Sequence, residues 1–134
     1  MMFNKIENLK SYPVLIDILQ NILKIEDMIA IENEYKLNNN TLFSVINNNH
    51  IIGLLGVSNS DNEVVIKHIA VLNCLQKQGI GKTIVNAIHS LYPNKVIVAE
   101  TDKDAVLFYS RLGFEIFSLG EKYPGVIRYK CVKK

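Results

Sequence analysis

The chain has 134 residues, of which 49% are hydrophobic and 21% are charged, and its formal net charge is +2 at pH 7. This length suits one domain with one core, and a nearly neutral chain argues against a dedicated nucleic-acid surface. No apolar run reaches the roughly 18–20 residues that span a bilayer, and the N-terminus lacks the basic-then-apolar pattern of a signal peptide. We therefore expect a single cytoplasmic domain over residues 1–134 that binds neither nucleic acid nor membrane.

The N-terminal part of the chain predicts helices. Ser11 is a suitable cap for a helix with Pro13 in its first turn, followed by apolar residues at helical spacing up to Leu23. A second helical stretch is expected from about Ile25 to Leu37, with Tyr35 among its apolar members.

The middle of the chain predicts three consecutive antiparallel strands. Two of them, residues 41–46 and 51–57, flank the turn NNNH and form a hairpin. The third, EVVIKHIAV at residues 63–71, is rich in β-branched residues. A loop with the sequence LNCLQKQ follows.

The C-terminal part alternates helices and strands. From Gly79 an apolar stripe at a period of 3.6 predicts a helix that ends near Pro93, and KVIVAET (95–101) is apolar enough to be a strand buried on both faces. Residues 102–113 predict a helix capped by Asp102 or Asp104 and ended by Gly113. Strands at 114–119 and 126–132 are joined by the loop GEKYPG. The order predicts an α/β fold (an α+β mixed sheet) with helices on both faces.

The segment QKQGIGKT (76–83) has the composition of a loop that binds phosphate. Glycine-rich turns into helices present main-chain N–H groups to an anion. A nucleotide P-loop requires glycine where Gln76 stands, and the dinucleotide fingerprint requires glycine where Ile84 stands, whereas a Q/R-x-x-G-x-G/A pyrophosphate loop fits Gln76, Gly79 and Gly81. An ordinary turn with glycines for packing is the remaining alternative.

Two motifs together resemble the GNAT family of acetyl-coenzyme A-dependent N-acetyltransferases. HIAVLNCLQKQGIGKTIVNAI (68–88) is similar to the strand–loop–helix with which the family binds coenzyme A, and AVLFYSRLGF (105–114) is similar to its A-x-x-F-Y-x-x-x-G-F motif. The resemblance covers roughly residues 40–132. It implies the GNAT-like acyl-CoA N-acyltransferase fold, a central mixed sheet flanked by helices, with acetyl-CoA as cosubstrate.

The resemblance also assigns residues to the site. It implies that the main chain of Ile69, Ala70 and Val71 binds the pantetheine arm, and that Tyr109 is the general acid for the thiolate. The pyrophosphate is expected to lie against the amides of Gln76, Lys77, Gln78, Gly79, Ile80, Gly81 and Lys82, with side-chain help from Lys82 and Thr83. Phe108, Tyr109 and Asp102 complete the expected cofactor contacts, although many family members have asparagine near the position of Asp102.

The general base is not fixed by a motif. Glu63, His68, Glu100 and Glu121 are candidates, and Glu100 is favoured because it ends the central strand. His68 alternates with Ile69 and is expected on the opposite face. No spacing of Cys or His suggests a metal site, and Cys74 has no assigned role.

We therefore expect an enzyme, a monomer or homodimer, that transfers acetyl from acetyl-CoA directly to a primary amine of an unidentified acceptor. The alternative is a non-catalytic acyl-CoA sensor.

Overall fold

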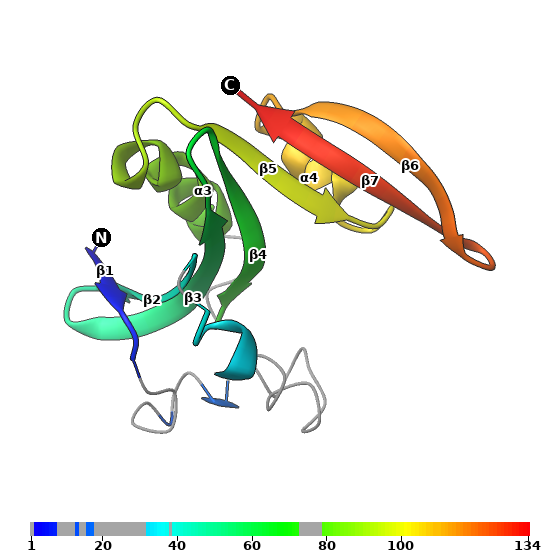
Figure 1. The fold of residues 1–134 in the computed structure, drawn as a ribbon. Coiled ribbons are helices and arrows are strands. Elements are labelled where there is room, and N and C mark those ends of the chain that lie inside the picture. The colour runs from blue at the N-terminus through cyan, green and yellow to red at the C-terminus, as the bar shows by residue number, and fades with distance from the viewer. Residues whose placement is uncertain (1, 8–12, 14–15, 18–31, 38, 73–78) are drawn as a thin grey trace.

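The computed structural model describes residues 2–7, 13, 16–17, 32–37, 39–72 and 79–134. Seven strands form one sheet in the order β1-β2-β3-β4-β5-β7-β6 (Figure 1). Their bounds are β1 Met2–Lys5, β2 Asn40–Asn47, β3 His50–Asn59, β4 Glu63–Val71, β5 Val96–Thr101, β6 Glu115–Tyr123 and β7 Val126–Lys133. β4 and β5 are parallel and the other neighbouring pairs are antiparallel, so the predicted mixed sheet is confirmed.

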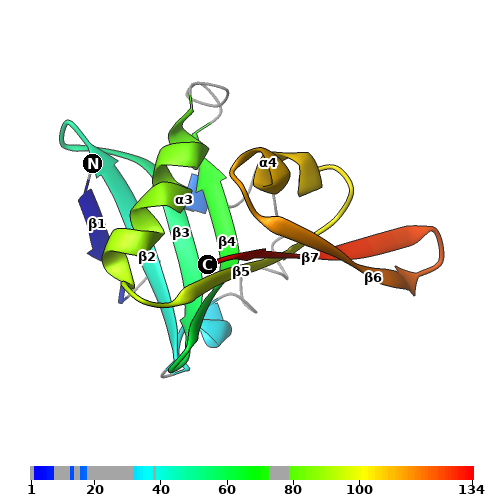
Figure 2. The same cartoon turned by 90° about the horizontal axis from the view of Figure 1, so that it is seen from above.

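Helices α3 (Ile80–Leu91) and α4 (Val106–Arg111) lie on one side of the sheet (Figure 2). The main core is on this side, where Ile84, Val85 and Ile88 of α3 pack on residues of the central strands, among them Leu55 and Ile97. A smaller core on the other side combines Leu42, Leu54 and Ala70 with Ile6, Ile16 and Tyr35. The apolar stripe that predicted α3 is therefore its buried face.

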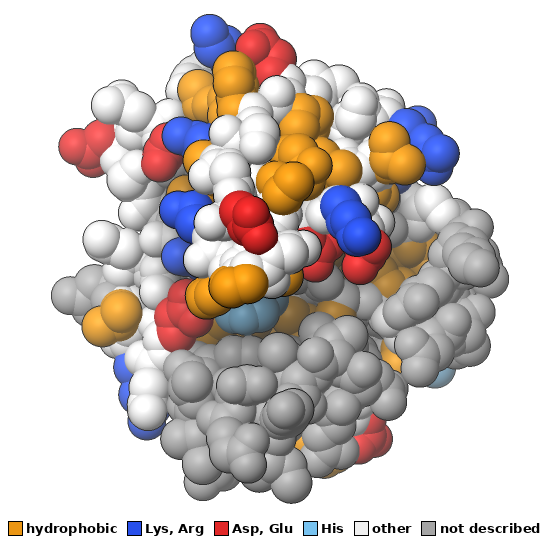
Figure 3. Space-filling model, turned by 90° about the vertical axis from the view of Figure 1, so that its right-hand side faces the viewer, with side chains coloured by type: hydrophobic (Ala, Val, Ile, Leu, Met, Phe, Trp, Pro, Cys, Tyr) orange, Lys and Arg blue, Asp and Glu red, His pale blue; other side chains and the backbone are white. Residues whose placement is uncertain are grey.

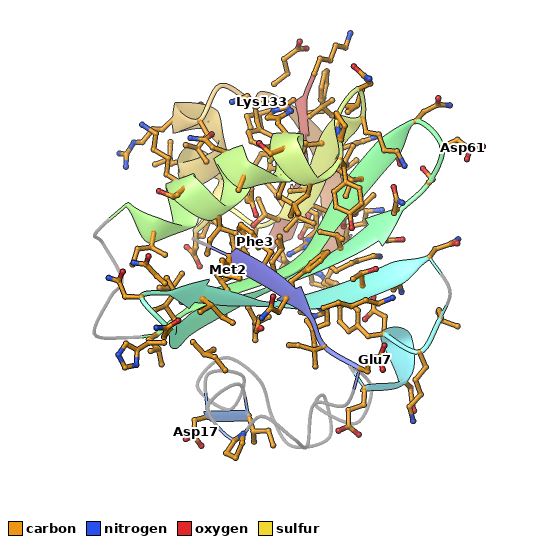
Figure 4. All side chains as sticks on the ribbon, turned by 90° about the vertical axis from the view of Figure 1, so that its left-hand side faces the viewer. Met2, Phe3, Glu7, Asp17, Asp61 and Lys133 are labelled. Carbon is orange, nitrogen blue, oxygen red and sulfur yellow. The ribbon has the colours of Figure 1, made fainter. Side chains whose placement is uncertain are left out.

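The described N-terminal residues support part of the expected helical region. Residues 32–34 are helical and residues 35–37 form a turn, while residues 13, 16 and 17 are also helical. Ser11 and most of the residues predicted to form the two helices lie outside the described part of the chain. Figure 4 shows Met2 and Phe3 on β1, at the edge of the sheet, with Glu7 and Asp17 beyond it.

The first hairpin is confirmed, and its turn has a clear local cause. Asn48 and Asn49 both have positive φ, 51° and 67°, which asparagine tolerates and which a two-residue hairpin turn requires. The turn joins β2 and β3 through the pair Asn47↔His50.

Three expectations about the elements are wrong. Met2–Lys5 forms an unpredicted edge strand, which pairs with β2. Helix α4 is shorter than residues 102–113, and neither aspartate caps it: its first flanking residue is Ala105, without a side-chain cap. Strand β6 runs to Tyr123 through most of the expected loop GEKYPG, so only Pro124 and Gly125 separate β6 from β7.

Candidate active site

The parallel strands β4 and β5 separate near the middle of the sheet. Their pairing runs from Glu63↔Val96 to Ile66↔Ala99, and no further pair joins them within the described residues. β4 nevertheless continues to Val71, still paired with β3, whereas the end of β5 is paired with β7. The two strands diverge in Figure 1, and we call this separation of their backbones, at the carboxyl end of β4, the opening.

A β-bulge in β4 lies where the strands separate. Ile66 pairs with Val57 and His68 pairs with Gly56, so Lys67 is an extra residue in the ladder. Val64 and Ile66 before the bulge belong to the main core, and Ile69 and Val71 after it also pack there. The bulge therefore changes which alternate residues face α3, because one inserted residue reverses the alternation of side chains.

The residues expected to bind the pantetheine arm all lie in the diverging part of β4. Ile69 and Val71 are partly buried against the main core, while Ala70 is buried on the other face. The sequence thus brings Ile69, Ala70 and Val71 to the opening.

The described end of the glycine loop begins α3. Gly79 has φ 78° and ψ 8°, in the left-handed region that favours glycine, and it immediately precedes the helix. Thr83 donates from its hydroxyl to the Gly79 carbonyl oxygen at 3.1 Å, so this side chain is used within the turn. Lys82 and Thr83 are exposed and Ile80 is half-buried. Gln76, Lys77 and Gln78 lie outside the described residues.

Gly81 has a packing partner. A Cβ added at Gly81 would lie 3.4 Å from the Phe108 ring of α4. This glycine therefore brings the first turn of α3 close to α4, which is a packing role of the kind that the ordinary-turn alternative gives to the glycines.

Tyr109 is the buried residue of α4, with 6% of its surface exposed. Its ring packs edge-on against Phe108 and Phe114, with centroid separations of 5.1 and 5.2 Å. Burial, with a smaller contribution from Cys131, raises the pKa of the Tyr109 phenol to about 12. The phenol therefore keeps its proton throughout the physiological pH range.

Asp102 and Glu100 lie at the end of β5, and each has a local partner. The Asp102 carboxylate accepts a hydrogen bond from the Asp104 amide at 2.9 Å, and its carbonyl accepts one from Val106, so this residue shapes the turn before α4. The Glu100 carboxylate lies 3.5 Å from the Arg128 guanidinium of β7. Because Ile97 and Ala99 face the main core, alternation directs Glu100 to the other face of the sheet.

Glu63 and Glu121 are not near the opening. Glu63 begins β4, eight residues before Val71, which corresponds to roughly 25 Å of strand. Glu121 accepts a hydrogen bond from the Gly125 amide and so closes the β6–β7 turn, with Tyr123 beside it and 68% exposed.

His68 has a hydrogen-bonding partner that its sequence position does not indicate. Its Nδ1 lies 2.7 Å from the hydroxyl of Tyr35, and the two rings are 5.7 Å apart. A Cβ at Gly56, the residue paired with His68, would overlap the Tyr35 hydroxyl. Sequence reasoning assigned Tyr35 to an apolar helical stripe and did not connect it with His68.

Comparison with known proteins identifies the family. The model of the acetyltransferase (GNAT) domain matches residues 38–116, more than half of the chain. The chain belongs to the GNAT acetyltransferase family. The resemblance inferred from the two motifs is thereby confirmed.

Part of the chain also matches a relative that is named as an N-acetyltransferase. The chain is 40% identical over 58 residues to an uncharacterized N-acetyltransferase of Bacillus methanolicus; the match covers 42% of the chain and 48% of that relative. The chain thus spans about half the length of the relative.

Two solved structures share the fold along almost the whole chain. One is a putative GNAT acetyltransferase from Desulfovibrio desulfuricans, with a TM-score of 0.79 and 14% identity over 99% of this chain and 98% of that one. The other is an aminoglycoside 6'-N-acetyltransferase complexed with coenzyme A, also with a TM-score of 0.79 and 14% identity, over 99% and 96%. These likenesses confirm the expected GNAT fold.

Two other kinds of feature are absent from the described residues. Among them, no group of three or more His, Cys, Asp or Glu side chains is arranged to hold a metal ion. In the same part of the chain, no helix combines the length and apolar character needed to cross a bilayer.

Proposed function

We propose that this GNAT protein is an acetyl-CoA-dependent N-acetyltransferase that transfers acetyl directly to a primary amine. The observation that carries the proposal is the opening between β4 and β5, with the left-handed turn at Gly79 leading into α3. Family membership adds the reaction class. The coenzyme A named for one solved structure of the same fold supports the same cosubstrate.

The opening suits a long, partly polar cosubstrate. Beyond Ile66, β4 has no further pair with β5 within the described residues, and an amide-containing pantetheine arm can pair with main-chain groups there. We assign this role to the main chain of Ile69 and Ala70, and extend it to Val71 from the family motif alone. The pyrophosphate would lie at the N-terminus of α3, where the first N–H groups have no partner within the helix and the helix dipole is positive. Gly79 to Thr83 form the described part of this contact, with residues 76–78 proposed from the sequence.

The transfer requires one bond to form and one to break. The amine nitrogen attacks the thioester carbonyl carbon, and the carbon–sulfur bond then breaks to give the amide and the thiolate of coenzyme A. One proton must leave the amine nitrogen and one must reach the sulfur. We propose Tyr109 as the donor to sulfur, because it holds the tyrosine position of the family motif AVLFYSRLGF and its phenol carries a proton. Phe108 and the turn at Asp102 would help to form the cofactor wall.

An amine panel tests the proposed function. Release of free thiol from acetyl-CoA should rise above the rate without acceptor for at least one primary amine, and the product should be the N-acetyl compound by mass spectrometry. Calorimetry should show saturable binding of acetyl-CoA. Saturable binding with no amine-dependent thiol release would instead favour a non-catalytic acyl-CoA sensor.

Tyr109→Phe tests the donor role. Loss of a general acid lowers rates by 10²-fold or more in typical enzymes, so we expect kcat to fall about 10²-fold. The ring and its edge contacts are retained, so the Kd of acetyl-CoA from calorimetry should stay within about two-fold. An unchanged kcat would exclude Tyr109 as the donor. Tyr123→Phe, at the exposed tip of β6, is the matched control and should leave kcat unchanged.

A further inference from the structure

Three features of the fold determine where the imidazole of His68 lies: the bulge in β4, Gly56 in β3, and Tyr35. The bulge at Lys67 shifts the alternation of β4, so His68 lies on the same face as Ala70 and not under α3. Gly56 lies opposite His68 and leaves room for the Tyr35 hydroxyl above β3. Tyr35 then reaches Nδ1 of His68 at 2.7 Å. Bulges beside active sites commonly redirect a side chain in this way.

His68 lies where β4 has left β5. The last pair between these strands ends at Ile66, two residues earlier, and alternation puts His68 and Glu100 on the same face. Nδ1 is engaged by Tyr35, while Nε2 has no hydrogen-bond partner among the described residues. Figure 3 views the molecule from the right-hand side of Figure 1, where hydrophobic and acidic side chains lie close together.

Burial of the ring favours a neutral imidazole. Burial lowers the pKa of His68, the negative charge of Glu34 opposes this effect, and the positive charge of Lys67 adds to it. Glu34 and Lys67 also lie 4.0 Å apart as an ion pair. Burial and Glu34 raise the pKa of the Tyr35 phenol, which therefore stays protonated.

We propose that His68 is the general base of the acetyl transfer, and that Tyr35 is the positioning residue that fixes its ring. The inference rests on the proposed function. In the tautomer with hydrogen on Nδ1, this N–H donates to the Tyr35 oxygen and leaves a lone pair on Nε2. The attacking amine gives its proton to Nε2 as the carbon–nitrogen bond forms, and the imidazolium later releases it to water. The thiolate takes its proton from Tyr109, and the Tyr109 phenolate regains one from water.

The acid and the base would then act from opposite faces of the sheet. Tyr109 belongs to the core under α3 and α4, whereas His68 faces Tyr35. The acceptor amine would approach the opening from the side of Tyr35 and Glu100, and the thiolate would be protonated from the side of α4. This arrangement keeps the two proton transfers apart.

The test compares variants on an amine that the wild-type protein acetylates. His68→Asn should lower kcat about 10²-fold and abolish one acid limb of the pH–rate profile. Because the pKa of His68 is lowered, this limb should lie below about pH 6.5 in the wild-type protein. Tyr35→Phe should lower kcat about ten-fold, as expected for one lost hydrogen bond, and should move the limb to lower pH, because the imidazolium loses its acceptor. The Kd of acetyl-CoA should change little in both variants.

His50→Asn, at the exposed turn between β2 and β3, is the control and should keep the wild-type profile. A His68→Asn protein that retains the limb, or an active wild-type protein with no such limb, would overturn the role of His68 alone. The pH–rate profile of the wild-type protein tests the role of His68 even if the His68→Asn protein does not fold. Failure of the wild-type protein to acetylate any amine would overturn the proposed function together with this inference.

Discussion

At the scale of single residues, Tyr35 can lie where it does because Gly56 has no Cβ atom. The hydroxyl of Tyr35 occupies the place where any other residue at 56 would have its Cβ. The sequence predicts a β-strand at this position, and glycine is unfavourable within strands because it has no side chain to pack. Its presence there is explained by the close approach of the tyrosine ring.

Gly56→Ala should therefore displace Tyr35. We expect a loss of about 1–3 kcal/mol in the free energy of unfolding, measured by urea denaturation, because the added methyl group overpacks a filled space. In a Tyr35→Ala background the same substitution should cost much less, since the space is then empty. Equal costs in the two backgrounds would contradict the assigned contact.

The roles of individual residues were harder to predict from sequence than their burial. Tyr35 and Tyr109 both appear as members of apolar stripes, and both are mostly buried. Only the GNAT resemblance singled out Tyr109. The link from Tyr35 to His68 spans 33 residues and requires both the bulge and the glycine, so no local pattern predicts it.

At the scale of elements, the two glycines at the start of α3 have different tasks. Gly79 has a left-handed backbone with open space around its Cα, whereas Gly81 is helical and faces Phe108. The first is required by conformation and the second by packing between helices. The pattern Gly-x-Gly does not distinguish these tasks.

Gly79→Ala should destabilise the protein more than Gly81→Ala. A left-handed alanine costs about 1 kcal/mol, so we expect a fall of this size in the free energy of unfolding for Gly79→Ala. Gly81→Ala should change it by less than about 0.5 kcal/mol, because alanine favours the helix and its methyl group only touches the Phe108 ring. Urea denaturation of both variants gives the comparison, and a larger loss for Gly81→Ala would contradict it.

The errors in the predicted elements have local causes. GEKYPG has two glycines and a proline, which are typical of a loop, yet Gly120 has φ 78° at an irregularity inside β6, and the ladder resumes beyond it. Helix α4 begins late because the Asp102 carboxylate accepts a hydrogen bond from Asp104 in the preceding turn. β1 has only four residues and depends on β2 for its hydrogen bonds, so its own sequence carries little signal.

At the scale of the whole molecule, the sheet consists of two parts, β1–β4 and β5–β7, joined by four residue pairs between β4 and β5. The part formed by β6 and β7 extends away from the rest (Figure 1) and carries exposed apolar side chains, including Phe117, Tyr123 and Ile127. The order of the elements from β2 to β7, and the family, could be predicted because these strands and helices have their own periodicity and two motifs fix the spacing. The separation of β4 and β5 could not, because it is a relation between two strands.

The extra residue at position 67 has a consequence for reading related sequences. If the strand kept every residue but paired without the bulge, strict alternation would place His68 under α3 and would turn Ile69 and Val71 toward Tyr35. The same sequence would then offer the opposite set of side chains to the same ligand. A relative that lacks one residue here needs no bulge to keep His68, Ile69 and Val71 on their present faces, so a gap of one position in an alignment would preserve the chemistry of this strand.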